Sequence, residues 1–396
     1  MLILAALAAT LSATPAPDIA ALSARLDEHP SLAALAVEAE ARRLDGRSRL
    51  GLPNPSVALG VNNVPINDPL QFDEYLPSSK SVTVTQALPS RRLREARSAV
   101  DEARADVALT MMRMRRDQLE AALRVSLREI DAAEDIDQLV ARQLAVYDDL
   151  AEVLESAAAA GESRFVALAD IDADRAAADT TAADAARMAA QARSRLESLV
   201  GAVDRPPNLE TIEPPMSEGQ LRFHAVALAE AQARAAEAGV EIRERDFDLG
   251  YEVSVSYFQR ESGAMFDGDD WVSARVGVSV PLWSRWNQQP ALEAARRDAD
   301  AAALRTADAR RSALDEFRAA TAAYAAARRS RSALEGRIEA LQALAAAAQR
   351  EYETGYGDLR PVLEARASAL EVEVRMLQLD LEADRAAARM NALTLD

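Results

Sequence analysis

Residues 271–283 alternate between apolar and polar side chains. The even positions from Val272 to Leu282 are all apolar, whereas most odd positions, such as Ser273 and Arg275, are polar or small. A period of two indicates a β-strand with one apolar and one polar face. Residues 249–260 alternate in the same way. Two such strands of about ten residues, with aromatic residues at their ends, have the length and pattern of a transmembrane β-hairpin.

A second, weaker hairpin is predicted nearer the start of the chain. Residues 54–64 alternate, with Val57, Leu59 and Val61 on one face, and residues 80–88 alternate again. The intervening residues 65–79 are rich in proline, asparagine and aspartate, which indicates a loop. The chain therefore contains four predicted strands, arranged as two hairpins.

The remaining segments follow the three- and four-residue spacing of α-helices. No glycine or proline interrupts residues 90–160, so this segment alone predicts a helix about 105 Å long. Unbroken helices of this length are typical of coiled-coil packing rather than of globular cores. The predicted helices are residues 18–52, 90–160, 162–200, 217–247, 287–353 and 358–392.

The order of helix, hairpin, long helix, turn and helix occurs twice. His224 lies 195 residues after His29, and Pro281 lies 192 residues after Pro89. Independent landmarks with nearly the same offset indicate a tandem duplication. The predicted parts are a first repeat at 18–203, a proline-rich linker at 204–216 and a second repeat at 217–396.

Four strands in one chain predict an oligomer. An open sheet edge is not tolerated in lipid, and the smallest transmembrane barrels have about eight strands. Symmetry then allows a dimer with eight strands or a trimer with twelve.

The N-terminal residues 1–17 have the pattern of a secretory signal peptide. An apolar run over residues 1–13 is followed by small residues and T-P-A-P, although no lysine or arginine follows Met1. We therefore expect export. No other stretch has eighteen uncharged apolar residues, so no transmembrane helix is predicted.

Composition narrows the classes of function. The net charge of −18 argues against nucleic-acid binding, and the absence of cysteine removes disulfides, thiolate metal sites and an acylated N-terminal cysteine. The chain has two histidines, His29 and His224, which we expect to cap helices or pack rather than to bind a metal. We predict no catalytic, metal-binding or cofactor-binding residue. An enzyme has the least support, because paired carboxylates occur only along helical faces.

Taken in order, the motifs resemble those of the TolC-type outer-membrane efflux channels. The motifs are H-P-S-L at 29–32, L-P-N-P at 52–55, V-T-Q-A-L-P at 84–89, L-R-E-A-R at 93–97, G-V-S-V-P-L-W at 277–283 and G-Y-G-D-L-R-P-V-L-E-A at 355–365. The resemblance covers the whole chain after the signal peptide. It implies a mainly α fold with a β-barrel portion: a homotrimer with a twelve-stranded barrel in the outer membrane and a long α-helical barrel in the periplasm.

The resemblance also implies that the protein catalyses no reaction. The trimer would be the passive exit duct of a tripartite efflux system, docked onto a periplasmic adaptor (membrane fusion) protein and an inner-membrane RND-type pump. The segment Q-A-L-P after the acidic pair Asp73 and Glu74, together with W-x-S-x-x-V-G-V-S-V-P-L-W, looks most like the heavy-metal efflux branch. Export of drugs or organic solutes is the alternative substrate class.

Three groups of site residues follow from the resemblance. Glu364 matches an acidic residue that lines the constriction in relatives, whereas Pro361 stands where a second acidic residue is frequent, so a pore aperture is expected at Asp358, Arg360 and Glu364. The hairpin tips are expected to contact the adaptor through Gly161, Gly355, Gly357 and Leu359. A membrane girdle is expected at Tyr251, Tyr257, Trp271, Trp283 and Trp286.

Each group also has a purely structural interpretation. The tip charges could cap an exposed turn, Leu359 could pack the tip, and the aromatic residues could edge a soluble sandwich. The alternative function is a soluble periplasmic coiled-coil spacer. It explains the long helices but not the four alternating strands.

Overall fold

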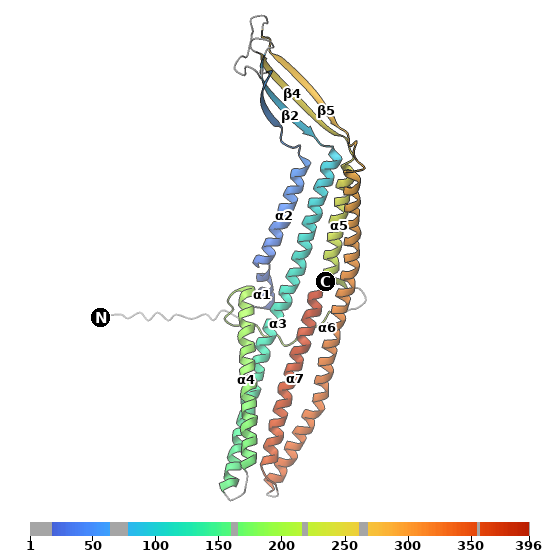
Figure 1. The fold of residues 1–396 in the computed structure, drawn as a ribbon. Helices are drawn as coiled ribbons and strands as arrows, with labels where there is room; N and C mark the ends of the chain where they lie inside the picture. The colour runs from blue at the N-terminus through green and yellow to red at the C-terminus, as the bar shows by residue number, and fades with distance from the viewer. Residues whose placement is uncertain are drawn as a thin grey trace, which may run out of the picture. The chain divides into compact units, whose positions relative to one another are not determined.

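The computed structural model describes residues 18–63, 78–159, 165–215, 221–260, 268–354 and 357–395, and its fold is drawn in Figure 1. The expected signal peptide at 1–17 lies outside this part of the chain, as do Gly161 and Gly355.

The described chain is mainly helical with a small β portion, which confirms the predicted fold class. The helices are α1 (Ile19–Leu26), α2 (Pro30–Leu50), α3 (Arg91–Ala159), α4 (Phe165–Val200), α5 (His224–Arg245), α6 (Gln288–Glu353) and α7 (Arg360–Leu393). The strands are β1 (Ser56–Asn62), β2 (Ser79–Leu88), β3 (Arg222–Phe223), β4 (Gly250–Arg260), β5 (Trp271–Ser279) and β6 (Thr394–Leu395). Among the described residues, no helix combines the length and apolarity needed to cross a bilayer.

The chain forms two compact units. The sheet unit comprises Ala34–Met112 and Ala225–Arg310, and it holds the four longer strands. The helical unit comprises Met1–Ala33, Arg113–His224 and Arg311–Asp396. The long helices α3 and α6 contribute residues to both units.

The sheet unit is built on an antiparallel sheet with the strand order β1-β2-β4-β5. Each repeat contributes one hairpin, and the two hairpins join through β2 and β4. At this junction Thr83 pairs with Ser256 and Val84 pairs with Val255. The hydroxyl oxygens of Thr83 and Ser256 lie 2.8 Å apart although the residues are 173 positions apart in sequence. The two hairpins therefore form one continuous sheet.

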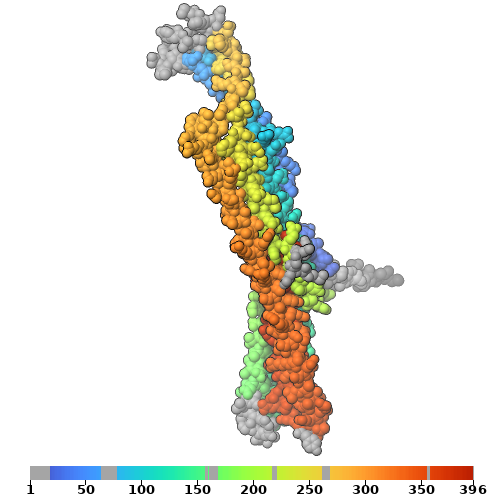
Figure 2. Space-filling view, turned by 90° about the vertical axis from the view of Figure 1, so that its right-hand side faces the viewer, coloured from blue at the N-terminus to red at the C-terminus, as the bar shows by residue number. Residues whose placement is uncertain are grey.

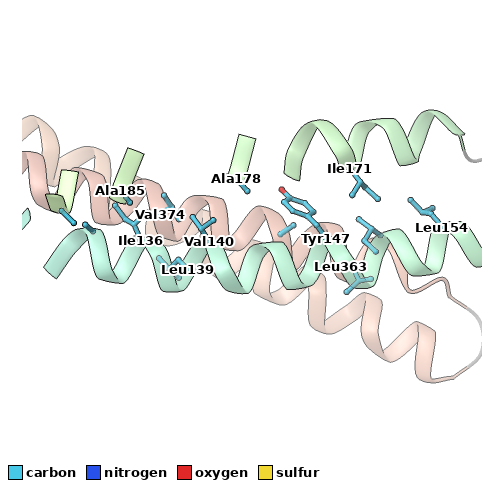
Figure 3. Packing of buried hydrophobic residues seen from close by; sticks show 14 residues of the cluster. Ile136, Leu139, Val140, Tyr147, Leu154, Ile171, Ala178, Ala185, Leu363 and Val374 are labelled. Carbon is cyan, nitrogen blue, oxygen red and sulfur yellow. The ribbon is translucent and has the colours of Figure 1, made fainter. Parts of the chain in front are cut away.

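The core of the helical unit is a narrow seam between α3, α4 and α7. Val140 and Tyr147 from α3 are buried there beside Ile171 from α4 and Leu363 from α7, as Figure 3 shows. Many other members of the seam are alanines, whose small side chains let helices approach closely. Each fully buried large apolar side chain contributes about 1.5–3 kcal/mol, so a long seam can hold helices together without a thick core.

The prediction of one unbroken helix over residues 18–52 is wrong. The chain leaves the helix after Leu26 and starts a new one at Pro30. Proline has no N–H to donate within a helix and suits the first helical position. The ring of His29 caps this start, because its Nδ1 accepts a hydrogen bond of 3.2 Å from the backbone N–H of Ser31. The capping role expected for His29 is thereby confirmed.

The segment between the repeats is attached to the helical unit as a strap, residues 201–215. The backbone N–H of Leu209 donates to the Asp131 carboxylate at 2.5 Å, and that of Ile212 donates to Asp384 Oδ1 at 2.9 Å. Ile212 is buried in a cluster that includes Phe317 of α6. A two-residue bridge between β3 and β6 then joins the segment after the strap to the end of the chain. Such a short bridge has no sequence signature and was not predicted.

Candidate functional site

One face of the four-stranded sheet is almost entirely apolar and exposed. The register aligns valine, leucine and tyrosine side chains of all four strands on this face. Leu59 of β1 is 80% exposed and Val272 of β5 is 72% exposed. Contiguous exposed apolar surface on this scale marks an interaction site. The apolar residues of this face are Val57, Leu59, Val61, Val82, Val84, Leu88, Tyr251, Val253, Val255, Tyr257, Val272, Ala274, Val276 and Val278.

The opposite face of the sheet is lined mainly by small hydroxylated residues. Serine and threonine dominate, and the amide of Asn62 donates to Ser81 Oγ at 3.1 Å. Glu252 lies across Gly277, because a Cβ at Gly277 would come within 2.7 Å of Glu252 Cγ. One face therefore suits lipid or another apolar partner, and the other suits water.

Both edges of this sheet are open within the described residues. There, β1 pairs only with β2 and β5 pairs only with β4. Unpaired edge strands expose a row of backbone N–H and C=O groups, which is a ready template for another strand. A sheet with an apolar face and two open edges is incomplete as a single copy in a nonpolar environment.

The structure divides the aromatic residues expected in the girdle into three settings. Tyr251 and Tyr257 lie on the apolar face and are nearly half exposed. Trp271 pairs with Phe258 on the opposite, polar face, and the Arg260 guanidinium lies 4.1 Å from its ring centroid. This cation–π contact belongs to the polar face of the sheet, and a place for Trp271 in the membrane girdle stays a prediction.

The remaining two tryptophans, Trp283 and Trp286, follow β5 in a turn before α6. Their side chains are 63% and 69% exposed. Figure 2 shows the segment around the start of α6, in orange, standing out beside the yellow α5 of the same unit. Their place in the girdle stays a prediction.

The expected aperture residues form one local cluster at the start of α7. Arg360 Nε donates to Glu364 Oε1 at 2.6 Å, and the Arg360 backbone N–H points to Asp358 Oδ1 at 3.4 Å. Within this cluster the Glu364 carboxylate is paired with Arg360 along the helix, whereas the Asp358 carboxylate lies at the exposed turn. Arg360 and Glu364 also line a small cavity of about 160 Å³ between α3, α4 and α7.

The tip residues have structural roles in the described part of the turn. Gly357 follows the end of α6, where a Cβ would lie 2.9 Å from Glu351 Cβ and 3.0 Å from backbone atoms. The backbone N–H of Gly357 also donates to the Glu351 carbonyl at 3.0 Å. Leu359 is partly buried and packs against the seam of α3, α4 and α7. The tight turn explains Gly357, and contact of these residues with an adaptor stays a prediction.

A polar clasp near the same cavity was missed from the sequence. The hydroxyl of Tyr147 on α3 donates to Glu371 Oε1 on α7 at 3.2 Å, and Gln143 Nε2 donates to the Tyr147 hydroxyl at 3.0 Å. Burial raises the pKa of Tyr147 to about 12, and the negative charge of Glu371 adds to the shift. Gln143 and Tyr147 are four residues apart on one helical face, which was the only available signal.

Two buried carboxylates were also missed. Asp384 of α7 accepts a hydrogen bond of 2.7 Å from Arg128 Nε of α3, and both side chains are almost fully buried. Glu129, which follows Arg128 in α3, accepts a hydrogen bond of 2.7 Å from Arg385 Nη2 and is also paired with Arg195 of α4. Buried charges are stable only when paired and hydrogen-bonded, so these contacts fix α3, α4, α7 and the strap at one level of the helical unit.

Comparison with solved structures places the fold among bacterial outer-membrane channels. The outer-membrane channel OprN superposes with a TM-score of 0.76 at 19% identity, over 94% of this chain and 89% of that chain. The outer membrane protein VceC from Vibrio cholerae gives a TM-score of 0.71 at 15% identity, over 93% and 96% of the two chains. The open-state MtrE outer membrane channel of Neisseria gonorrhoeae gives 0.71 at 18% identity, over 95% and 88%.

A family model matches the second part of the sequence. Residues 217–394 match the model of the family described as "Outer membrane efflux protein". This match spans nearly all of the second repeat. Comparison with curated proteins finds no match.

Proposed function

We propose that this chain is an outer membrane efflux protein over its whole length and forms the exit duct of a tripartite efflux system. Three copies would each contribute β1, β2, β4 and β5 to a twelve-stranded barrel in the outer membrane. Their long helices would form a tunnel through the periplasm. An inner-membrane RND-type pump would supply the driving force, and a periplasmic adaptor would connect pump and duct.

The observation that carries this proposal is the sheet with one exposed apolar face and two open edges. Joining β5 of one copy to β1 of the next would satisfy both edges and leave no backbone group unpaired in lipid. The apolar face would then meet acyl chains, while the serine- and threonine-rich face would line a water-filled passage. The family match of the second repeat and the superpositions on outer-membrane channels support the same reading.

The periplasmic mouth would lie at the turns between the long helices. Three copies of Asp358, Arg360 and Glu364 around an axis would form a charged aperture. Because Arg360 is paired with Glu364 in each copy, the uncompensated charge would be that of Asp358, and the ring would favour cations. Gly357 and Leu359, with Gly161 and Gly355, would belong to the surface that meets the adaptor.

The first substrates to test are heavy-metal cations, on the motif resemblance of residues 271–283. Drugs and organic solutes are the alternative class. A strain that lacks its own exit duct, complemented with this chain and its neighbouring pump genes, would regain tolerance to one class and not the other.

Fractionation and electrophoresis test the duct itself. We expect the protein in the outer-membrane fraction, as a trimer in detergent extracts that persists until the sample is heated. Planar bilayers should show stepwise conductance. A monomer in the soluble periplasmic fraction would instead support the coiled-coil spacer and defeat the proposal.

A further inference from the structure

One cavity of the helical unit is lined by more positive than negative side chains. It has a volume of about 340 Å³ and lies between α4 and α7, over α3. Its apolar lining includes Ile136 and Ala185, which Figure 3 labels. Four arginines and three carboxylates line it as well, although the whole chain has a net charge of −18. We call this space the arginine cavity.

The surplus positive charge lies where two guanidinium groups share one carboxylate. Arg385 of α7 donates to Glu129 Oε1 through Nε at 3.0 Å and through Nη2 at 2.7 Å. Arg195 of α4 donates to Glu129 Oε2 through Nη2. Both oxygens of this buried carboxylate are therefore occupied, and its single negative charge faces two positive charges.

The other two arginines of the cavity do not add to the surplus. Arg187 is paired with Asp184 at 3.0 Å, and Arg375 is paired with Glu382 at 3.4 Å. Each of these pairs is neutral as a whole. The surplus is thus confined to the two guanidinium groups that share Glu129.

Arg195 and Arg385 have N–H donors that Glu129 does not use. A guanidinium carries five N–H donors in a fixed fork. Arg385 uses Nε and Nη2 on Glu129, whereas Arg195 uses Nη2 on Glu129 and Nε on the Gln191 carbonyl at 3.4 Å. Among the described residues, neither Nη1 has a hydrogen-bond partner. Both arginine side chains are about half exposed, so these donors are accessible to a ligand.

We propose that the arginine cavity is a binding site for a small organic anion that carries carboxylate or phosphate groups. Guanidinium forks bind both groups through paired N–H···O hydrogen bonds. Pockets of about 300–1,000 Å³ hold small molecules, so the volume suits a free anion of the size of a di- or tricarboxylate. Thr181, Gln191 and Gln378 line the same cavity and supply hydroxyl and amide groups for the remaining ligand oxygens. The bound anion links α4 to α7 by sharing Arg195 and Arg385 with Glu129.

The site belongs to a single copy of the chain. All of its residues lie in the helical unit. It is therefore present whether or not the chain forms an efflux duct, and it can be measured on the isolated protein.

Calorimetric titration of the full-length, detergent-solubilised protein tests the site. The probes are citrate and inorganic phosphate, each compared with chloride at equal ionic strength. We expect saturable binding of one anion per chain, and the probe that binds identifies the preferred group as carboxylate or phosphate. No saturable binding of either probe would overturn the proposal.

Two variants of α7 place the anion in the cavity. R385Q removes one fork while Glu129 keeps Arg195, and the affinity should fall about tenfold or more because a charge-assisted hydrogen bond is lost. The matched control is R389Q, one helical turn further on, where Arg389 is exposed and paired with Glu316 at 3.6 Å. It removes the same charge outside the cavity and should leave the affinity nearly unchanged. Equal losses in R385Q and R389Q would show that the probe responds only to overall charge, and they would overturn the proposal.

E129Q distinguishes an anion site from an ion cluster that only holds helices together. The glutamine keeps the shape of the side chain but removes the negative charge that competes with the ligand, so the anion should bind about tenfold more tightly. Unchanged or weaker binding in folded E129Q would overturn the proposal. Helical circular dichroism shows whether each variant is folded. If E129Q does not fold, R195Q, in which Glu129 keeps Arg385, decides instead, because its affinity must fall as in R385Q.

Discussion

Arg128 Nε and Asp384 Oδ2 lie 2.7 Å apart, in a pair whose side chains are 6% and 5% exposed. The other oxygen of Asp384 accepts hydrogen bonds from the Thr211 hydroxyl at 3.1 Å and from the Ile212 backbone N–H at 2.9 Å. A single carboxylate thereby connects two helices and the strap between the repeats.

Removing one member of this pair should lower stability more than removing both. D384N leaves the Arg128 charge buried without its counter-charge, so we expect a loss of about 3–5 kcal/mol in unfolding free energy. R128M/D384L replaces the pair with apolar side chains of similar size and should recover part of that loss. Recovery is incomplete because the Thr211 hydroxyl and the Ile212 N–H lose their acceptor. Urea unfolding of the detergent-solubilised protein, followed by helical circular dichroism, measures both.

The matched control is the exposed pair of Arg389 and Glu316, whose side chains are 63% and 51% exposed. E316Q should change stability by at most about 1 kcal/mol. Equal effects of D384N and E316Q would contradict the structural role assigned to Asp384.

Gly277 should be intolerant of a side chain only while Glu252 lies across it. In G277A the new Cβ would lie 2.7 Å from Glu252 Cγ and push that side chain aside, at a cost of about 0.5–3 kcal/mol. The proposed trimer should dissociate at a lower temperature on gels than that of the unmodified protein. G277A/E252A removes the opposing atoms and should restore the original temperature. A double variant no better than G277A would show that the contact with Glu252 is not the cause.

Stability should depend on the ionisation of Tyr147 at high pH. Its pKa is 10.0 in the ordinary phenol and about 12 when folded, so the folded protein favours the protonated hydroxyl. This contribution is fully present below pH 10 and is lost as the pH rises towards about 12. Y147F cannot ionise and should lack this part of the alkaline loss. Unfolding midpoints between pH 8 and pH 12, compared for the two proteins, give the result, and parallel curves would contradict it.

At neutral pH the same variant tests the clasp between α3 and α7. Y147F removes the hydrogen bond to Glu371 and should cost about 1 kcal/mol. Amide exchange should accelerate in α7 around Leu363 and Val374, which pack on the same seam. Unchanged exchange in α7 would show that the seam alone holds the helix.

Glu364 should influence ion preference at the proposed aperture. E364Q leaves Arg360 without its partner at 2.6 Å and adds one positive charge per copy, so reversal potentials in bilayers should shift away from cations. The control is E382Q on the same helix, where Glu382 is paired with Arg375 at 3.4 Å. Glu382 lies eighteen residues on, at five helical turns, and thus on the same face of α7. Equal reversal potentials in wild type and E364Q would remove Glu364 from the aperture.

Periodicity predicted the fold class because the spacing of apolar residues differs between a helix and a strand and shows which face of each is apolar. The alternation holds over Gly250–Tyr257 and Val272–Ser279, and it indicates one apolar and one polar face, as the register shows. The same alternation places Trp271 at an odd position, on the polar face of the sheet, where it pairs with Phe258. The start of a new helix at Pro30 could also have been predicted from the sequence, because proline favours the first position of a helix.

The polar contacts could not be predicted in the same way. Arg128, Glu129 and Asp384 look like ordinary charges of a solvated helix, since nothing local distinguishes a buried charge from an exposed one. Arg128 and Asp384 are 256 positions apart, and only the packing of α3 against α7 brings them together. The strap has no regular structure of its own, and the partners of its N–H groups lie on distant helices.

The junction between β2 and β4 at the centre of the sheet can form only late in synthesis. β2 can pair with β1 as soon as the first hairpin exists, but its other edge must wait for β4, which emerges only after two long helices, the strap and α5. Throughout that interval a valine-rich hairpin is without its neighbour and is exposed to any other strand it encounters. We therefore expect newly made chains to need a holding partner between translation and assembly.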